Sequence, residues 1–253
     1  MPNQAMLPEK HAAAIHAADR IHDSWDAIVR TYVVPSPDGL NRFAYARAAA
    51  EARPPIDAYL RSLEAIAVSR LSRVEQLVFW INLYNALTIK TVLDHYPVPS
   101  IKRIRLSFWR PWAGPFAAKQ MRIEGRALSL RDVEHGILRP SFNEPRVHFA
   151  INCASYGCPN LQPTAFTTDN VESLMDACAR QFVNHPRAVR IEQGRLIISS
   201  IFVWYGEDFG PDAASVIAQL KRHAEPALAE ALDGRTKIDG HQYDWSLNDV
   251  GPA

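Results

Sequence analysis

The sequence predicts an α+β fold in which helices pack on a small antiparallel sheet. Several long windows repeat apolar residues with the period of an amphipathic helix. Short alternating segments flank Glu124-Gly125 and Gln193-Gly194, and such dipeptides favour two-residue hairpin turns. Because hairpins join antiparallel strands, this mixture argues against an alternating βαβ array.

Composition places the chain among ordinary globular proteins. Of its 253 residues, 47% are hydrophobic and 22% are charged, and the length suffices for one large core. We expect residues 1–70 to form a helical lead-in that packs on a main domain of residues 71–253, so that the chain is one globular unit.

The charge balance excludes some partners. The net charge is +1, so no overall field recruits nucleic acid or an anionic membrane. No apolar run approaches the roughly 18 residues that span a bilayer. The first residues lack the apolar core of a signal peptide. We therefore expect a cytoplasmic protein if the chain is complete, and a periplasmic or secreted one if a leader has been removed. Three cysteines make no disulfide scaffold, and no motif indicates a cofactor.

The N-terminal part is expected to be helical. Residues 9–33 repeat apolar side chains on one face, and the turn-forming residues 35–39 end that helix. Two short helices are expected at residues 41–52 and 55–66. None of these segments places reactive residues at an informative spacing.

The helix expected from Ser72 to His95 is the first informative element. Ser72 and Glu75 form a capping-box pattern, and the helix is apolar nearly all round, which indicates that it is buried. Buried amides must be hydrogen-bonded, so Asn82 and Asn85 require partners. They either tie loops to the helix or orient a catalytic group.

Shorter elements complete the chain. Ser129, with Asp132 three residues later, is expected to cap a helix that carries Glu134 and His135. The pattern then predicts helices at residues 169–185 and 212–232, the second broken near Pro226, and a last strand at residues 237–243.

The central stretch, residues 146–161 (RVHFAINCASYGCPNL), contains two of the three cysteines. The alternation in VHFAI predicts a half-buried central strand that ends at Cys153. Proline is favoured at the first position of a helix, so Pro159 places Cys158 at a helix N-terminus. There the helix dipole favours a thiolate.

Five separate blocks are spread in order over residues 72–248: FWINLYNALTI, LSLRDVEHGILRP, HFAINCASYGCPNL, SIFVWYGEDF and YDWSLN. Together they resemble the family called domain of unknown function 547. The resemblance implies a family found in bacteria and plants, whose bacterial members often carry export signals. Plant members have serine in place of the second cysteine of the central block, which keeps Cys153 a candidate beside Cys158. The resemblance implies no reaction.

The leading hypothesis is a thiol-dependent hydrolase or acyltransferase that acts on an amide or thioester-like bond. Such an enzyme needs a cysteine nucleophile, an imidazole base and a group that orients the imidazole. We expect Cys158 to be the nucleophile, with Cys153 in reserve, and His148 to be the base, with His135 as the runner-up. Glu134 or Asn85 is expected to orient the imidazole, and Asn82 is a further candidate for that role. By analogy, this arrangement would be papain- or transglutaminase-like in a permuted order.

The substrate is expected to be a small molecule or a peptide, of a class that the sequence leaves open. Trp109 and Trp112 lie in a proline-punctuated loop and are expected to form a lid over the site. Asn82 and Ser155 are further candidate substrate-binding residues.

Three other interpretations remain open for the same residues. His148, Cys153 and Cys158 could bind zinc together with His135 or Glu134, although no second Cys/His pair exists to complete a common zinc motif. The two cysteines could also form a structural or switchable disulfide. Finally, the chain could be a non-enzymatic interaction or scaffolding module with buried cysteines.

Overall fold

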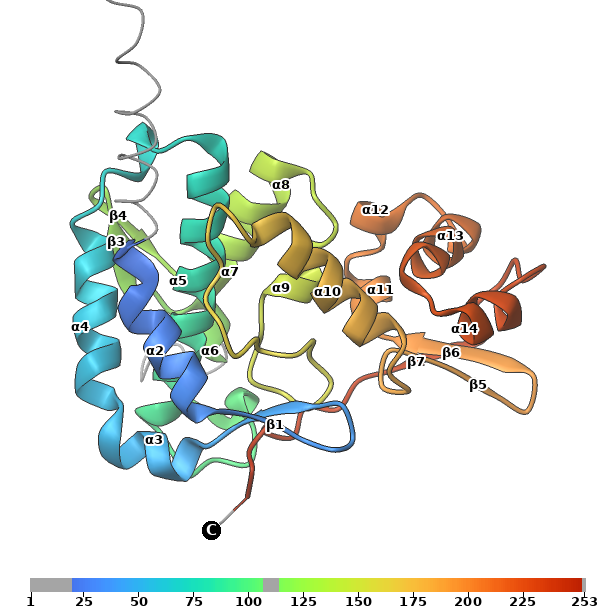
Figure 1. Cartoon of the computed structure of the whole chain (residues 1–253), viewed down its shortest axis with the longest axis horizontal. Helices are drawn as coiled ribbons and strands as arrows, with labels where there is room; N and C mark the ends of the chain where they lie inside the picture. Colours follow the sequence, from blue (N-terminus) through green and yellow to red (C-terminus); the bar gives the residue numbers. More distant parts are fainter. Residues whose placement is uncertain (1–19, 107–113, 252–253) are drawn as a thin grey trace, which may run out of the picture.

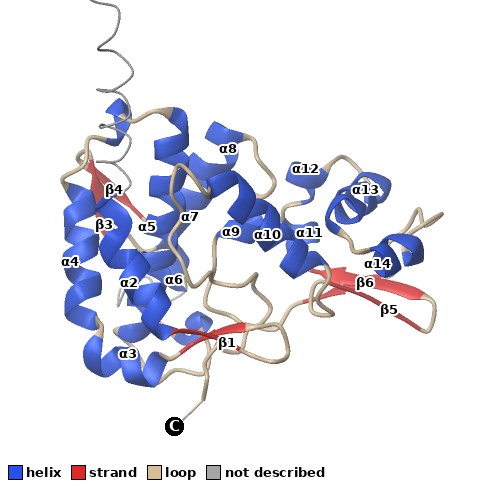
Figure 2. Cartoon of the chain, in the orientation of Figure 1, coloured by secondary structure: helices blue, strands red, loops and turns tan. Residues whose placement is uncertain are grey.

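The α+β class is confirmed by the computed structural model, which describes residues 20–106 and 114–251 (Figure 1, Figure 2). Its described part consists mostly of helices, with two two-stranded sheets and one three-stranded sheet at the periphery (Figure 2). A single hydrophobic core runs from Trp25 to Leu232 and includes side chains from both the N-terminal helices and the later elements.

Helix α5 (Arg73–Leu93) is the most deeply buried helix, as the sequence predicts. Every side chain from Leu77 to Leu93 except Lys90 is buried. The predicted capping box is present: the Ser72 hydroxyl accepts from the Glu75 N–H, and the Glu75 carboxylate accepts from the Ser72 N–H.

The N-terminal helices α3 (Tyr45–Glu51) and α4 (Arg53–Glu64) pack against α5, and α2 (Asp23–Tyr32) packs on α3 and α4 (Figure 1). The helix expected at residues 41–52 begins later than predicted. Residues Asn41–Phe43 form strand β2, which pairs with β1 (Val33–Pro35) across a turn. Strand pairing satisfies these backbone groups, so the helix starts only after Phe43.

Both predicted hairpins are present. Strands β3 (Met121–Ile123) and β4 (Arg126–Leu128) pair across Glu124-Gly125, and β5 (Val189–Glu192) and β6 (Arg195–Ser199) pair across Gln193-Gly194. Both residues of each turn have positive φ, as a type I′ turn requires. Strand β7 (Gly240–Gln242) then joins β6 in parallel.

Between these hairpins, Ser129 caps α7 (Leu130–Val133) with Asp132 as predicted. The helix widens to a π-turn, η5 (Glu134–Leu138), before α8 (Arg139–Phe142). The remaining helices are α6 (Gly114–Ala117), α9 (Val147–Ala150), α10 (Val171–Val183), α11 (Ile201–Trp204), α12 (Gly206–Phe209), α13 (Ala213–His223) and α14 (Pro226–Ala231), besides three 3₁₀ turns, η1 (Arg20–His22), η2 (Val68–Arg70) and η3 (Ile101–Arg103).

The prediction of a central strand ending at Cys153 is wrong. Residues Val147–Ala150 form the helical turn α9, and all four of these side chains are buried. Phe149 packs against Phe182 and Phe202, while His148 stacks on Tyr205. The alternation of residue types therefore does not mark one solvent-exposed and one buried face, because helices cover both faces of this segment.

The C-terminal segment, residues 243–250, crosses from β7 back towards β2 and ends near β1 (Figure 1). It hydrogen-bonds to Phe43 on one side and to Ala154, Tyr156 and Gly157 on the other. Residues 244–248 thereby lie against the central stretch.

None of the helices within residues 20–106 and 114–251 has the length and apolar character needed to cross a membrane.

The prediction that Asn82 and Asn85 are buried and bonded is confirmed. Asn85 donates to the Ala150 carbonyl at 3.0 Å and accepts from the Asn152 N–H at 2.8 Å. Asn82 makes the same pair of bonds to the backbone of Phe166, at 2.8 and 3.1 Å. Each amide thus joins α5 to a loop that lacks regular structure.

Replacing Asn85 with leucine should lower the free energy of unfolding by about 1–3 kcal/mol, because two buried backbone groups lose their partners. Denaturant unfolding measures this change. Asn82→Leu should cost a similar amount but leave the titration of Cys153 unchanged, since it holds a different loop. Unchanged stability in both variants would show that the amides are dispensable.

Candidate active site around Cys153

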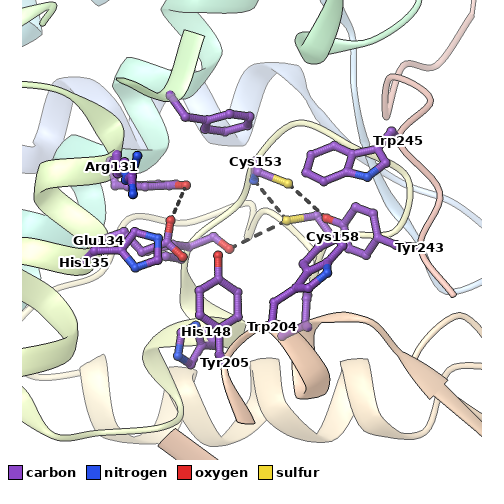
Figure 3. A pocket seen from close by; sticks show the side chains of 14 residues that line it. Arg131, Glu134, His135, His148, Cys153, Cys158, Trp204, Tyr205, Tyr243 and Trp245 are labelled. Atoms are coloured by element: carbon purple, nitrogen blue, oxygen red, sulfur yellow. Dashed lines mark hydrogen bonds between the residues drawn. The ribbon is translucent and has the colours of Figure 1, made fainter. Parts of the chain in front are cut away.

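A cavity of about 270 Å³ lies between η5, the central stretch, α11 and the C-terminal segment (Figure 3). Cys153 and Cys158 form part of one wall, next to aromatic rings. Glu134 and His135 lie across the cavity (Figure 3). The lining residues are Tyr84, Phe116, Arg131, Glu134, His135, His148, Ile151, Cys153, Cys158, Ile201, Trp204, Tyr205, Tyr243 and Trp245.

Cys158 does not begin a helix, so the prediction of a thiolate at a helix N-terminus is wrong. The chain after Pro159 is irregular. The Pro159 carbonyl accepts a hydrogen bond from the Asn152 side-chain amide at 2.6 Å. The Cys158 side chain points inward, is 4% exposed and accepts from the Cys153 N–H at 3.0 Å. Burial and the neighbouring Cys153 sulfur raise the pKa of Cys158 well above that of a free thiol.

The bend that presents Cys153 is held by a side chain. The Asn152 carbonyl oxygen accepts from the Ala154 N–H at 2.7 Å. Ala154 is fully buried with φ 64°, a left-handed conformation that is unfavourable for a residue with a Cβ. Strained backbone of this kind concentrates at functional sites, and here it lies immediately beside Cys153.

Cys153 is surrounded by hydrogen-bond donors. Its sulfur lies 3.0 Å from the Ser155 hydroxyl and 3.0 Å from the Tyr243 hydroxyl, and these two oxygens are 2.7 Å apart. Hydrogen bonds from the Cys158 thiol, and then from Ser155 and Tyr243, outweigh desolvation and lower the pKa of Cys153 to about 7. A substantial fraction of this thiol is therefore ionised at neutral pH.

Tyr243 reaches the sulfur because two backbones approach closely. The Gly157 N–H donates to the Asp244 carbonyl at 2.9 Å, and the Tyr156 N–H donates to the Ser246 carbonyl at 2.8 Å. A Cβ on Gly157 would lie 2.8 Å from the Asp244 nitrogen. Only glycine permits this contact without moving the C-terminal segment.

His148 lines the cavity and is held by a carboxylate. Its Nε2 lies 2.6 Å from Asp208 Oδ2, and its ring stacks on Tyr205 with 4.2 Å between ring centroids. Burial raises the pKa of Asp208, but hydrogen bonds from His148 and Arg139 outweigh it and hold that pKa well below its usual range. In the part of the chain that the structure describes, no histidine hydrogen-bonds to either sulfur.

Glu134 and His135 face the same cavity but differ in partners. The Tyr84 hydroxyl donates to Glu134 at 3.1 Å, so Glu134 does not hold the imidazole of His148. Arg139 lies 2.9 Å from His135 Nδ1, and because a guanidinium can only donate, this nitrogen is an acceptor. Burial lowers the pKa of His135, which keeps its ring neutral.

The other sequence candidates have structural positions. Asn85 fixes the backbone on both sides of Ile151 and contacts no histidine, and Asn82 does not line the cavity. Ser155 is buried beneath Cys153. Trp109 and Trp112 lie outside the described residues.

The structure also bears on the metal and disulfide interpretations. Within residues 20–106 and 114–251, no group of three or more His, Cys, Asp or Glu side chains is arranged to hold a metal ion. Cys153, Cys158 and Cys178 are all free thiols.

Sequence reasoning missed three residues of the site. Asp208 and Tyr205 come from the SIFVWYGEDF block, and Tyr243 comes from YDWSLN. Both blocks carried the family resemblance, but no spacing rule links them to Cys153, which lies 52 or more residues before these three residues.

Tyr243→Phe should move the ionisation midpoint of Cys153 up from about 7 towards the ordinary value of about 8.5, because the thiolate loses a donated hydrogen bond. The pH dependence of alkylation by iodoacetamide, followed by mass spectrometry, measures the midpoint. Tyr156→Phe is the matched control, since Tyr156 lines a different cavity. Equal midpoints in both variants would contradict the role given to Tyr243.

No curated protein matches this chain. No solved structure matches it either, so the permuted papain- or transglutaminase-like order stays an expectation. Residues 68–183 match the model of the family described as protein of unknown function, DUF547. This range includes α5 and both cysteines of the cavity. The family resemblance is thereby confirmed over residues 68–183, the range that contains the first three of the five sequence blocks.

Proposed function

We propose that this protein is a thiol-dependent hydrolase or acyltransferase that acts on an amide or thioester-like bond, with Cys153 as the nucleophile. The observation that carries the proposal is the environment of this sulfur. It lines a cavity of ligand size while two hydroxyl groups lie within hydrogen-bonding distance.

Cys153 is preferred over Cys158 on physical grounds. The thiolate is the reactive form of cysteine, and the pKa of Cys153 is lowered to about 7 whereas that of Cys158 is raised by burial. Cys158 instead supports the site, because its sulfur accepts from the Cys153 N–H and its side chain is the largest cause that lowers the pKa of Cys153.

A preformed thiolate changes what the histidine must do. Cys153 needs no base to remove its proton before attack, so His148 does not have to touch the sulfur. The sulfur attacks the carbonyl carbon and forms a C–S bond, and the bond to the leaving nitrogen or sulfur breaks. The leaving atom takes a proton from protonated His148.

The second half of the cycle uses the same groups in reverse. His148 accepts a proton from water, or from another acceptor nucleophile, as that oxygen or nitrogen attacks the acyl carbon. The C–S bond breaks and Cys153 leaves as the thiolate. Asp208 holds the imidazole in place through its contact with Nε2, the role predicted for Glu134 or Asn85.

His148 is preferred over His135 as the proton donor. Burial and the neighbouring Arg139 guanidinium lower the pKa of His135, which disfavours a protonated ring there. His148 is held by the Asp208 carboxylate instead, which lies 2.6 Å from its Nε2.

Iodoacetamide should label Cys153 in preference to Cys158 and Cys178 at neutral pH. The rate should rise as the pH increases through about 7 and level off near pH 8, because the lowered pKa completes thiolate formation there. The other two thiols are buried with raised pKa values, that of Cys178 to about 12. Peptide mapping by mass spectrometry measures all three. If neither cavity thiol alkylates below pH 8, the enzyme proposal falls and an interaction or scaffolding module replaces it.

Replacing His148 with glutamine should separate the acid–base role proposed for His148 from the nucleophilic role proposed for Cys153. Acyl turnover, measured with activated thioesters and anilides, should fall roughly 100-fold or more because the leaving group loses its proton donor. Alkylation of Cys153 should keep its rate, since iodide leaves without a proton.

Asp208→Asn should reduce turnover in the same direction with a smaller loss, because it only misorients the ring. Cys153→Ser should abolish both turnover and labelling. A His148→Gln variant that turns over normally would overturn the acid–base role of this residue.

A further inference from the structure

Three aromatic rings form a continuous wall beside Cys153 (Figure 3). Trp204 lies 4.9 Å from Tyr243 and 5.6 Å from Trp245, and Tyr243 lies 4.7 Å from Trp245, measured between ring centroids. We call these three residues the aromatic wall. Aromatic rings in a concave site provide apolar area at low entropic cost and bind flat apolar groups well.

The wall and the nucleophile are joined by one residue. The Tyr243 hydroxyl lies 3.0 Å from the Cys153 sulfur, while the ring of the same residue contacts both tryptophans. In a substrate whose carbonyl carbon is attacked by the sulfur, a group that lies on the wall is therefore only a few bonds away from that carbon.

Two members of the wall are held in place and one is open. Tyr243 and Trp245 belong to the C-terminal segment, whose backbone pairs with the central stretch, and the Lys102 ammonium lies 4.6 Å from the centre of the Trp245 ring. Trp204, at the end of α11, is 46% exposed although it is a large apolar residue. Because Trp204 is half-exposed beside two ordered rings, a ligand can bury apolar area against it.

The charged side chains that line the cavity lie on the side away from the wall. Arg131, Glu134 and His135 are on the opposite side, and His148 lies behind Tyr205 as seen in Figure 3. The rings themselves present apolar area, so an apolar group buries the most surface there.

From these observations we infer that the aromatic wall is the acyl-group subsite, and that the substrates are compounds whose acyl part carries a flat, aromatic or similarly apolar group close to the reacting carbonyl. The reaction in this inference rests on the proposed function, whereas the binding of such a group to the wall does not.

Two electrophiles test the subsite through the rate at which Cys153 is alkylated. N-phenyl iodoacetamide should react faster than iodoacetamide after each rate is divided by its rate with free N-acetylcysteine. Trp204→Ala should reduce this corrected ratio roughly three- to tenfold, as expected for the loss of one aromatic contact. Trp204→Phe should retain most of it.

Val203→Ala is the matched control, because Val203 precedes Trp204 on α11, is 47% exposed and does not line the cavity. Its ratio should equal that of the unmodified protein. The pH midpoint for iodoacetamide alone should stay near 7 in Trp204→Ala, which shows that the nucleophile is undisturbed.

A binding measurement separates failure of the subsite from failure of the reaction. Calorimetric titration of Cys153→Ser with 4-phenylbutyramide and with butyramide should show tighter binding of the phenyl compound, lost in the double variant with Trp204→Ala. If that preference holds while Cys153 proves unreactive, the subsite stands and the proposed reaction falls. No phenyl preference in either experiment, or one that survives Trp204→Ala, overturns the subsite.

Discussion

The candidate site depends on the close backbone contact between Gly157 and Asp244. This contact lets the C-terminal segment lie against the central stretch, with hydrogen bonds from Tyr156 and Gly157 to the carbonyls of Ser246 and Asp244. Tyr243 then reaches the Cys153 sulfur, and Trp245 lines the same cavity. A side chain at residue 157 would separate the two segments and remove the donor and the aromatic ring together.

The opposite side of the central stretch is held by a different kind of contact. Asn85, buried in α5, bonds to the backbone of both Ala150 and Asn152. Asn152 in turn bonds to Ala154 and to Pro159, which closes the loop around the two sulfurs. Because every one of these polar groups is buried, the loop keeps one conformation, since any other would leave them unpaired. The strained φ of Ala154 persists for this reason.

The electrostatic character of the cavity follows from these two sets of contacts, the Gly157–Asp244 backbone contact and the Asn85 hydrogen bonds. Hydroxyl and thiol donors gather around Cys153 and favour its anion, whereas Cys158 is enclosed and stays protonated. Asp208 contacts His148, whereas Arg139 contacts His135, whose pKa is lowered by burial and by the nearby guanidinium. The difference between the two cysteines therefore comes from their neighbours, not from their residue type.

Local chemistry accounts for what the sequence predicted correctly. The capping boxes at Ser72 and Ser129 and the type I′ turns at the two hairpins involve residues within a few positions of one another, so their energies do not depend on the rest of the fold. The burial of Asn82 and Asn85 followed from a helix that is apolar all round. Apolar alternation misled at VHFAI, because a short segment covered on both faces satisfies a helical turn as well as a strand.

The amino-acid sequence by itself therefore determined the α+β class, the buried helix with its two amides, and the stretch in which the two cysteines lie. The tertiary structure decided which cysteine is acidic and which carboxylate holds the histidine. Tyr243 is 90 residues from Cys153 and Asp208 is 60 residues from His148. A pKa is set by the groups that folding brings within a few ångströms, and neighbours this distant in sequence leave no periodic signal to read.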